Sequence, residues 1–149
     1  MDVSLFDIFL LHDRIEIMTR QDIIDRLKDY FSHDDDIEMV LLYGSVAKGT
    51  FNPKSDIDIA LYSKKELSFE VLAKIQTELS IMFDREIDVA DLKKAEGTFL
   101  YQIMTNAVKI KFEENIYVRY AMKALYFYED FLPILRRTQE EKLKRMLNG

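Results

Sequence analysis

Hydrophobic residues recur with two different periods along this chain, and each period indicates one kind of secondary structure. Apolar residues spaced three or four positions apart are typical of amphipathic helices, whereas apolar runs and strict alternation are typical of strands. The helical spacing is found in residues 19–31, 68–83, 92–106 and 113–147. The strand patterns are found in residues 37–43, 55–61, 84–91 and 107–112. No internal repeat and no Gly/Ser-rich or Pro-rich linker divides the chain, so we expect a single domain.

Local signals indicate where several of these helices begin or break. Thr19 can cap the first helix, with Asp22 three residues on, and Ser68 can cap the second. Pro133 should kink or interrupt the last segment, since proline lacks the amide that continues a helix. We assign most of the apolar stripe of this last segment to core packing. The stripe comprises Tyr117, Tyr120, Ala121, Ala124, Leu125, Tyr128, Leu132 and Leu135.

Composition excludes several classes of protein. The chain has 149 residues, 48% of them hydrophobic, which is enough for a packed core and argues against disorder. It contains no cysteine, and its two histidines, His12 and His33, are far apart, so we expect no disulfide, thiolate or histidine-cluster site. The net charge of −6 disfavours direct binding of nucleic acid. No apolar run approaches the ~20 residues that span a bilayer, and we expect a cytoplasmic protein with no membrane contact.

The two ends of the chain leave alternatives open. Residues 1–18 form an N-terminal extension that lacks the basic start of a signal peptide. Either Met18 is the biological start and residues 1–17 are a translation artefact, or this apolar extension packs on a partner or a symmetry mate. At the other end, a basic tail is either a solvated helix end or a docking surface for an acidic partner. The tail comprises Arg136, Arg137, Lys142, Lys144 and Arg145.

The candidate chemistry lies between Leu41 and Leu61. An apolar strand ends abruptly at Gly44-Ser45, where a missing side chain lets backbone amides approach a phosphate and a hydroxyl adds a donor. Ser45 can also begin a short helix. After ten intervening residues, Asp56 and Asp58 alternate with apolar residues, so both carboxylates point to one face of the second strand. Two carboxylates held so close repel each other, and a hard divalent cation would relieve the repulsion.

These residues resemble the signature of the DNA polymerase β-like nucleotidyltransferase superfamily, which joins a Gly-Ser turn to an Asp-x-Asp strand. The fuller string Gly-Ser-Val-Ala-Lys-Gly-Thr followed by Ser-Asp-Ile-Asp-Ile-Ala is similar to the superfamily's minimal nucleotidyltransferase (MNT) branch. The resemblance extends over roughly residues 19–147. It implies an α+β nucleotidyltransferase fold, with a small mixed β-sheet flanked by helices and a C-terminal helical segment. The domain would span residues 19–149, with a core at 19–112 and the helical segment at 113–149.

The resemblance also implies a third carboxylate, on the strand that follows the intervening helix. Asp88 occupies that place in the segment DREIDVAD. Because Ile87 and Val89 flank it on a short apolar strand, we prefer it to Glu86 and Asp91. Asp56, Asp58 and Asp88 would then hold two Mg²⁺ ions, with Asp88 also the candidate general base.

Four residues are candidates for holding the triphosphate of ATP. Gly44 and Ser45 form the turn that would contact phosphate. Lys48 could meet the phosphates as a point charge, or be an ordinary exposed loop lysine. Ser55 either orients a carboxylate or simply ends the loop before Asp56.

Members of the MNT branch are often antitoxins paired with a HEPN-domain ribonuclease toxin. The resemblance therefore implies transfer of AMP from ATP to a tyrosine of the cognate toxin, within a hetero-oligomer of the two proteins. Two alternatives stay open: adenylylation of a small molecule such as an aminoglycoside, and masking of the toxin by contact alone.

Overall fold

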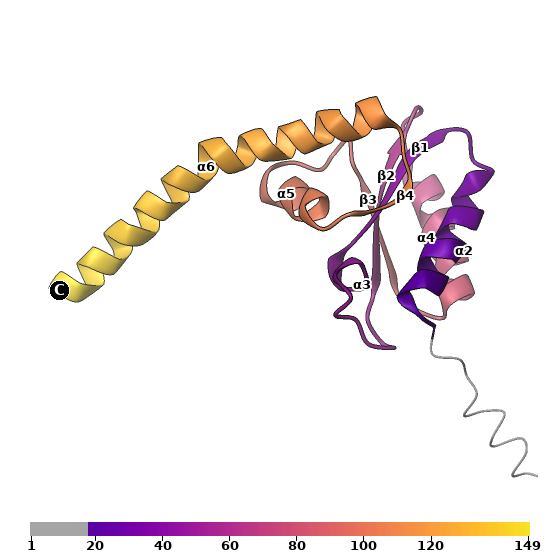
Figure 1. Cartoon of the computed structure of the whole chain (residues 1–149), viewed down its shortest axis with the longest axis horizontal. Helices are drawn as coiled ribbons and strands as arrows, with labels where there is room; N and C mark the ends of the chain where they lie inside the picture. Colours follow the sequence, from indigo (N-terminus) through magenta and orange to yellow (C-terminus); the bar gives the residue numbers. More distant parts are fainter. Residues whose placement is uncertain (1–17) are drawn as a thin grey trace, which may run out of the picture.

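A four-stranded mixed β-sheet forms the centre of the protein, and the computed structural model describes residues 18–149 (Figure 1). The strand order is β3-β2-β1-β4; β1 pairs antiparallel with β2 and β4, while β2 and β3 are parallel. The strands are β1 (Ile37–Tyr43), β2 (Ile57–Ser63), β3 (Ile87–Asp91) and β4 (Val108–Lys111). The helices are α2 (Arg20–Ser32), α3 (Gly44–Lys48), α4 (Phe69–Phe83), α5 (Gly97–Thr105) and α6 (Glu114–Asn148). The predicted α+β fold with a C-terminal helical segment is confirmed.

The helices cover the two faces of the sheet with separate cores. On one face, α2 and α4 pack on Val40, Leu42, Ile57, Ile59 and Leu61. On the other, α5 and the first turns of α6 pack on Met39, Leu41 and Ala60. Figure 1 shows α2 and α4 on one side of the strands and α5 on the other. The alternation along each strand therefore decides which face a side chain serves.

Capping residues begin the two helices of the first face as the sequence predicts. The Thr19 side chain accepts from the Asp22 amide, and the Asp22 carboxylate accepts from the Thr19 amide at 2.8 Å, which completes a capping box. Ser68 accepts from the Val71 amide at the start of α4. Met18, the last residue of the expected extension, packs partly buried against the first core. The rest of that extension lies outside the described residues.

Three expected boundaries or contacts are wrong. The helix expected over residues 92–106 begins only at Gly97, whose φ of +57° prevents a right-handed helix from running through it. The second strand begins at Ile57, so Asp56 lies just before it. Phe69, the first apolar residue of α4, is 82% exposed, whereas Ile75, Leu79 and Phe83 further along the helix are buried.

The long C-terminal helix differs most from expectation. Helix α6 continues through Pro133, so the expected interruption is wrong. The alternative, a kink, stays a prediction, and Figure 1 shows α6 bending along its length. Only Ile116, Tyr120 and Ala124 are buried, so the expected core packing of its stripe fails beyond the first three turns. Figure 1 shows the remainder projecting away from the sheet. No helix within residues 18–149 is both long and apolar enough to cross a lipid bilayer.

Candidate active site

Three polar side chains lie in a row across the sheet, one on each of three neighbouring strands. Asp58 of β2 pairs in register with Asp88 of the parallel strand β3 and with Tyr43 of the antiparallel strand β1. Residues in register on neighbouring strands point to the same face. That face is the one covered by α5, because Asp58 and Ala60 are two residues apart and Ala60 belongs to its core. The topology thus brings together two carboxylates that are 30 positions apart in the sequence.

Gly44 and Asp58 approach each other more closely than any other residue type would allow. A Cβ on Gly44 would lie 2.1 Å from Oδ2 of Asp58, well inside any real contact. Gly44 also adopts a φ of +72°, which glycine reaches without strain. The Gly-Ser turn and the Asp-x-Asp strand are therefore in direct contact, as a combined phosphate and metal site requires.

The charges of the site act on one another. Burial raises the pKa of Asp58, and repulsion from Asp88 and Asp56 raises it further. Burial together with the charges of Asp58 and Asp88 raises the pKa of Tyr43 to about 12, so its phenol stays protonated at neutral pH. Asp56 is exposed, just before β2, and its effect on Asp58 places its charge near the row.

The carboxylates fit a hard divalent cation. Within residues 18–149, no three His, Cys, Asp or Glu side chains lie close enough to form a closed metal cage. Mg²⁺ rarely uses such a cage; it usually binds one or two carboxylates together with substrate phosphates and water. An open pair of register-matched carboxylates beside a glycine turn suits that mode. The assignment of Asp56, Asp58 and Asp88 as metal ligands stays a prediction.

Helix α3 holds the Gly-Ser turn in place. Ser45 lies in its first turn and Lys48 in its last, where the lysine is exposed. The guanidinium of Arg20, from the first turn of α2, donates to the Val46 and Ala47 carbonyls at 3.1 and 2.9 Å. The Val46 carbonyl also accepts from the Gly49 amide at 3.2 Å, so Arg20 adds to the backbone contacts at the C-terminal end of α3 and anchors this short helix.

A family model for polymerase β-type nucleotidyltransferases matches residues 25–115, which include Asp56, Asp58, Asp88 and the Gly-Ser turn. The chain belongs to this nucleotidyltransferase family. A curated relative, the protein adenylyltransferase MntA of Shewanella oneidensis, is 25% identical over 93 residues, 62% of this chain and 67% of the relative.

Solved structures show the same nucleotidyltransferase fold. A chain from the crystal structure of a toxin–antitoxin with AMP-PNP superposes with a TM-score of 0.64 at 22% identity, over 83% of this chain and 98% of that one. A chain from the complex of a tri-AMPylated Shewanella oneidensis HEPN toxin with an MNT antitoxin gives a TM-score of 0.64 at 18% identity, over 85% and 99%.

The loop before the acids of this nucleotidyltransferase is closed by Ser55. Its hydroxyl accepts from the Asn52 amide at 2.9 Å, and its amide donates to the Asn52 carbonyl at 3.0 Å. The nearby guanidinium of Arg85 lies over the Phe51 ring, 5.7 Å from its centroid. Of the two alternatives for Ser55, these contacts favour the ending of the loop. Its role and that of Lys48 toward nucleotide stay predictions.

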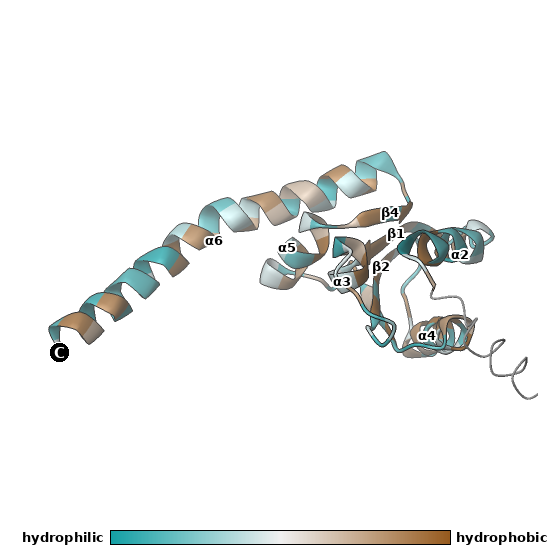
Figure 2. Cartoon of the chain, turned by 60° about the horizontal axis from the view of Figure 1, so that its bottom comes forward, coloured by the Kyte–Doolittle hydropathy of each residue, from teal (hydrophilic) through white to brown (hydrophobic). Residues whose placement is uncertain are grey.

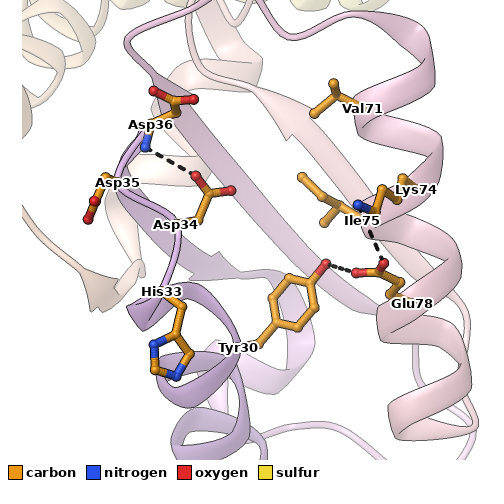
Figure 3. A pocket seen from close by; sticks show the side chains of 9 residues that line it. All are labelled: Tyr30, His33, Asp34, Asp35, Asp36, Val71, Lys74, Ile75 and Glu78. Atoms are coloured by element: carbon orange, nitrogen blue, oxygen red, sulfur yellow. Dashed lines mark hydrogen bonds and ion pairs between the residues drawn. The ribbon is translucent and has the colours of Figure 1, made fainter.

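A cavity lies on the face of the sheet that α2 and α4 cover, opposite the face that carries Asp58 and Asp88. Its volume is about 490 Å³, and it opens between α4 and the loop that follows α2. Figure 3 shows Tyr30 hydrogen-bonded to Glu78 across it and the Asp36 amide bonded to the Asp34 carboxylate. Lys65 also pairs with Asp36 at 3.2 Å. The acidic loop is therefore held by internal contacts, and none of the nucleotidyltransferase signature residues lines the cavity.

Sequence reasoning missed Tyr43 and Arg20. Tyr43 could have been found, because it directly precedes the Gly-Ser turn and ends a strand whose alternation places it beside the acids. Arg20 gives no such signal, since its partners are 26 and 27 positions away. On β4, Lys111 donates to the Phe31 and Asp34 carbonyls, and Lys109 lies over the Phe112 ring.

Proposed function

We propose that this protein is the antitoxin of a HEPN/MNT pair, which transfers AMP from ATP to a tyrosine of its cognate HEPN toxin with the help of two Mg²⁺ ions. The observation that carries the proposal is the register pairing of Asp58 with Asp88 directly against the Gly44 turn. The curated relative is named a protein adenylyltransferase, and similar structures contain an ATP analogue or an AMPylated toxin. These names support adenylyl transfer to a protein.

The reaction needs one bond to form and one to break. The tyrosine oxygen of the acceptor attacks the α-phosphorus of ATP, and the bond from that phosphorus to the pyrophosphate oxygen breaks. Asp88, exposed at the open edge of β3, would receive the proton of the acceptor hydroxyl. Gly44 and Ser45 would orient the triphosphate so that pyrophosphate leaves in line with the attack.

The metal would be held by this chain's own carboxylates. Asp56, Asp58 and Asp88 would supply oxygen ligands, together with phosphate oxygens of ATP, and bound Mg²⁺ would neutralise charge on the phosphates and the leaving pyrophosphate. Asp58 needs such a partner, because its pKa is raised by burial and by the two neighbouring acids. A divalent cation beside it converts that repulsion into attraction.

Intact-mass spectrometry of the cognate toxin tests the proposal. After incubation with this protein, ATP and Mg²⁺, the toxin should gain one or more adenylate groups on tyrosine. The double variant Asp56→Ala/Asp58→Ala should lower the rate by a factor of about 10² or more, since it removes the main electrostatic device of the site. Glu86→Gln, an exposed acid next to the same strand, is the matched control and should react normally.

Two results would overturn the proposal. An unmodified toxin that is nevertheless neutralised, equally well by the double variant, would make the protein a masking module. Pyrophosphate release that requires an aminoglycoside and ignores the toxin would make it a small-molecule adenylyltransferase.

A further inference from the structure

Most of α6 is not covered by any other part of the described structure. Beyond Ala124, its residues are exposed except for Phe127 and Leu132, which are half-buried. We call residues 125–148 the arm. At 1.5 Å per residue the arm is about 36 Å long, and Figure 1 shows it projecting freely beyond α5. Most of the stability of a helix in a protein comes from packing of its apolar face, so we expect the arm to pack on a partner.

One side of the arm carries an apolar stripe. At 100° per residue, its members fall within an arc of about 80°. The arm stripe comprises Leu125, Leu132, Leu135, Leu143 and Met146. Leu125 is 44% exposed, Leu143 57% and Met146 80%. Figure 2 shows apolar patches alternating with polar ones along this helix. Successive members lie seven, three, eight and three residues apart, which are one or two helical turns, and such a one-sided apolar stripe is the pattern of a helix that packs along another helix.

The end of the arm is basic, although the protein as a whole is acidic. Residues 136–149 contain five basic and two acidic residues, a net charge of +3, within a chain whose net charge is −6. Arg136 borders the arm stripe on one side and Lys142 on the other, by the same helical geometry. A partner surface that complements this end must therefore place acidic side chains beside its own apolar ridge.

The arm leaves the domain on the face of the sheet that carries Asp58, and helix α5 connects the two. Tyr128, near its start, stacks on Tyr101 of α5 with ring centroids 5.0 Å apart. Phe99 of the same helix contacts the ring of Tyr43 at 6.1 Å, and Tyr43 pairs in register with Asp58. Helix α5 therefore lies between the arm and the acids, on the same face of the sheet. A protein bound along the arm would lie on the face to which the carboxylates open.

We propose that the arm stripe is the docking surface for the protein acceptor of the adenylyl group, the cognate toxin. The proposal rests on the proposed function above. The part of the toxin that docks is a helix with an apolar ridge and flanking carboxylates, which packs lengthwise on the arm. Docking there would hold the toxin on the face of the sheet that carries Asp58 and Asp88. The tyrosine of the toxin could then reach these carboxylates past β3, the edge strand.

The chain offers a closely matched pair of variants. Leu143 lies on the arm stripe and is 57% exposed, while Ile134 lies on the other side of the same helix and is 59% exposed. Leu143→Glu should weaken toxin binding at least tenfold, measured by calorimetry without ATP, whereas Ile134→Glu should leave the affinity within twofold. With ATP and Mg²⁺, Leu143→Glu should raise KM for toxin while kcat at saturating toxin and the affinity for AMP-PNP stay unchanged. Circular dichroism verifies that both variants keep α6 folded.

A charge-reversal variant tests the role of the basic end of the arm. Lys142→Glu/Arg145→Glu should also raise KM for toxin and should reduce the dependence of toxin affinity on salt, because two favourable charges have been reversed. The same measurements on Glu140→Gln, another exposed residue of the arm, should match the wild type apart from a small rise in affinity.

The outcomes separate the docking surface from the chemistry. If wild-type protein modifies the toxin and Leu143→Glu binds it as well as wild type does, the docking surface is wrong and the proposed function stands. If wild-type protein neither binds nor modifies the toxin, the proposed function fails. If Leu143→Glu instead converts a dimer of this protein into a monomer, in light scattering, with toxin affinity unchanged, the arm stripe joins two copies and the proposal is overturned.

Discussion

Oδ2 of Asp58 lies against the α-carbon of Gly44, so close that a β-carbon there would come within 2.1 Å of it. The turn that would hold phosphate and the carboxylate that would hold metal are thus in direct contact. A larger side chain at position 44 must therefore displace the Asp58 carboxylate or the turn itself. This contact explains why a glycine stands at the end of β1, where the strand itself would accept many residues.

Gly44→Ala should therefore be more damaging than an ordinary glycine substitution. A positive φ alone costs a non-glycine residue about 1–2 kcal/mol, and the clash with Asp58 adds to that. Displacement of a reacting group by about 1 Å can lower a rate 10²-fold, so toxin adenylylation should fall at least that far.

Gly49→Ala is the control for Gly44→Ala. Gly49 has nearly the same backbone, with a φ of +75°, but no atom lies within 4 Å of the position that a β-carbon would take there. It should show the loss of stability in thermal unfolding without the loss of activity. Equal activity losses in the two variants would contradict a specific role for the Gly44–Asp58 contact.

Asp58→Asn should stabilise the protein at neutral pH in the absence of divalent cations. The folded pKa of Asp58 is raised above its ordinary value of 3.8 by burial and by Asp88 and Asp56. The folded state therefore binds its proton more tightly than the unfolded state, and stability falls as pH rises from 3.8 through the folded pKa. The amide carries no charge and escapes this loss.

Differential scanning fluorimetry across this range checks the sign. The melting temperature of Asp58→Asn should exceed that of wild type at neutral pH, and the difference should shrink as the pH approaches 3.8. Added Mg²⁺ should raise the wild-type melting temperature and leave the variant nearly unaffected. Asp35→Asn, in an exposed loop, should behave like wild type, and an Asp58→Asn protein less stable than wild type at neutral pH would refute the argument.

Asp88→Asn should lower toxin adenylylation by a factor of about 10² or more, because both a ligand and the proton acceptor are removed. The affinity of the protein for its toxin should not change, since Asp88 lies on the sheet and not on the arm. Single-turnover kinetics at saturating toxin would show the loss in the chemical step. Activity that depended on Asp91 instead would move the third carboxylate to the other end of β3.

Arg20→Gln should make the Gly-Ser turn less rigid, because Arg20 holds helix α3, which begins at that turn. Two charge-assisted hydrogen bonds to α3 are lost, each ordinarily contributing about 1.5–3 kcal/mol, although the exposed edge of the site reduces that value. We expect a higher KM for ATP and a lower melting temperature, with Arg20→Lys intermediate in both. Arg26→Gln, on the exposed side of the same helix, should change neither.

Much of the site could be predicted from the sequence because its signals are local. The apolar run of β1 ends at a Gly-Ser pair, and the Asp-x-Asp alternation fixes the face of the strand, so Gly44, Ser45, Asp56 and Asp58 were accessible. Thr19 and Ser68 carry their capping partners within three residues. Asp88 required the family resemblance, because nothing in its own strand distinguishes a register partner of Asp58 from an edge acid.

The features that escaped prediction depend on contacts between distant segments. The amphipathic period of α6 indicates which side is apolar, but only the fold shows that the sheet ends after three turns and leaves Leu135 and Leu143 uncovered. Gly97 interrupts an apolar period that continues on both sides of it, and its positive φ becomes visible only in the structure. Arg20 reaches α3 across 26 positions.

The separation of the sheet into a reactive face and a face covered by α2 and α4 has a practical consequence. The outer surface of α4 is remote from the acids and from the arm, and the protein contains no cysteine. Thr77→Cys, at an exposed position of α4, would therefore give a single attachment point for a fluorophore or a solid support. Such a reporter could follow toxin capture and nucleotide turnover in real time on one immobilised molecule.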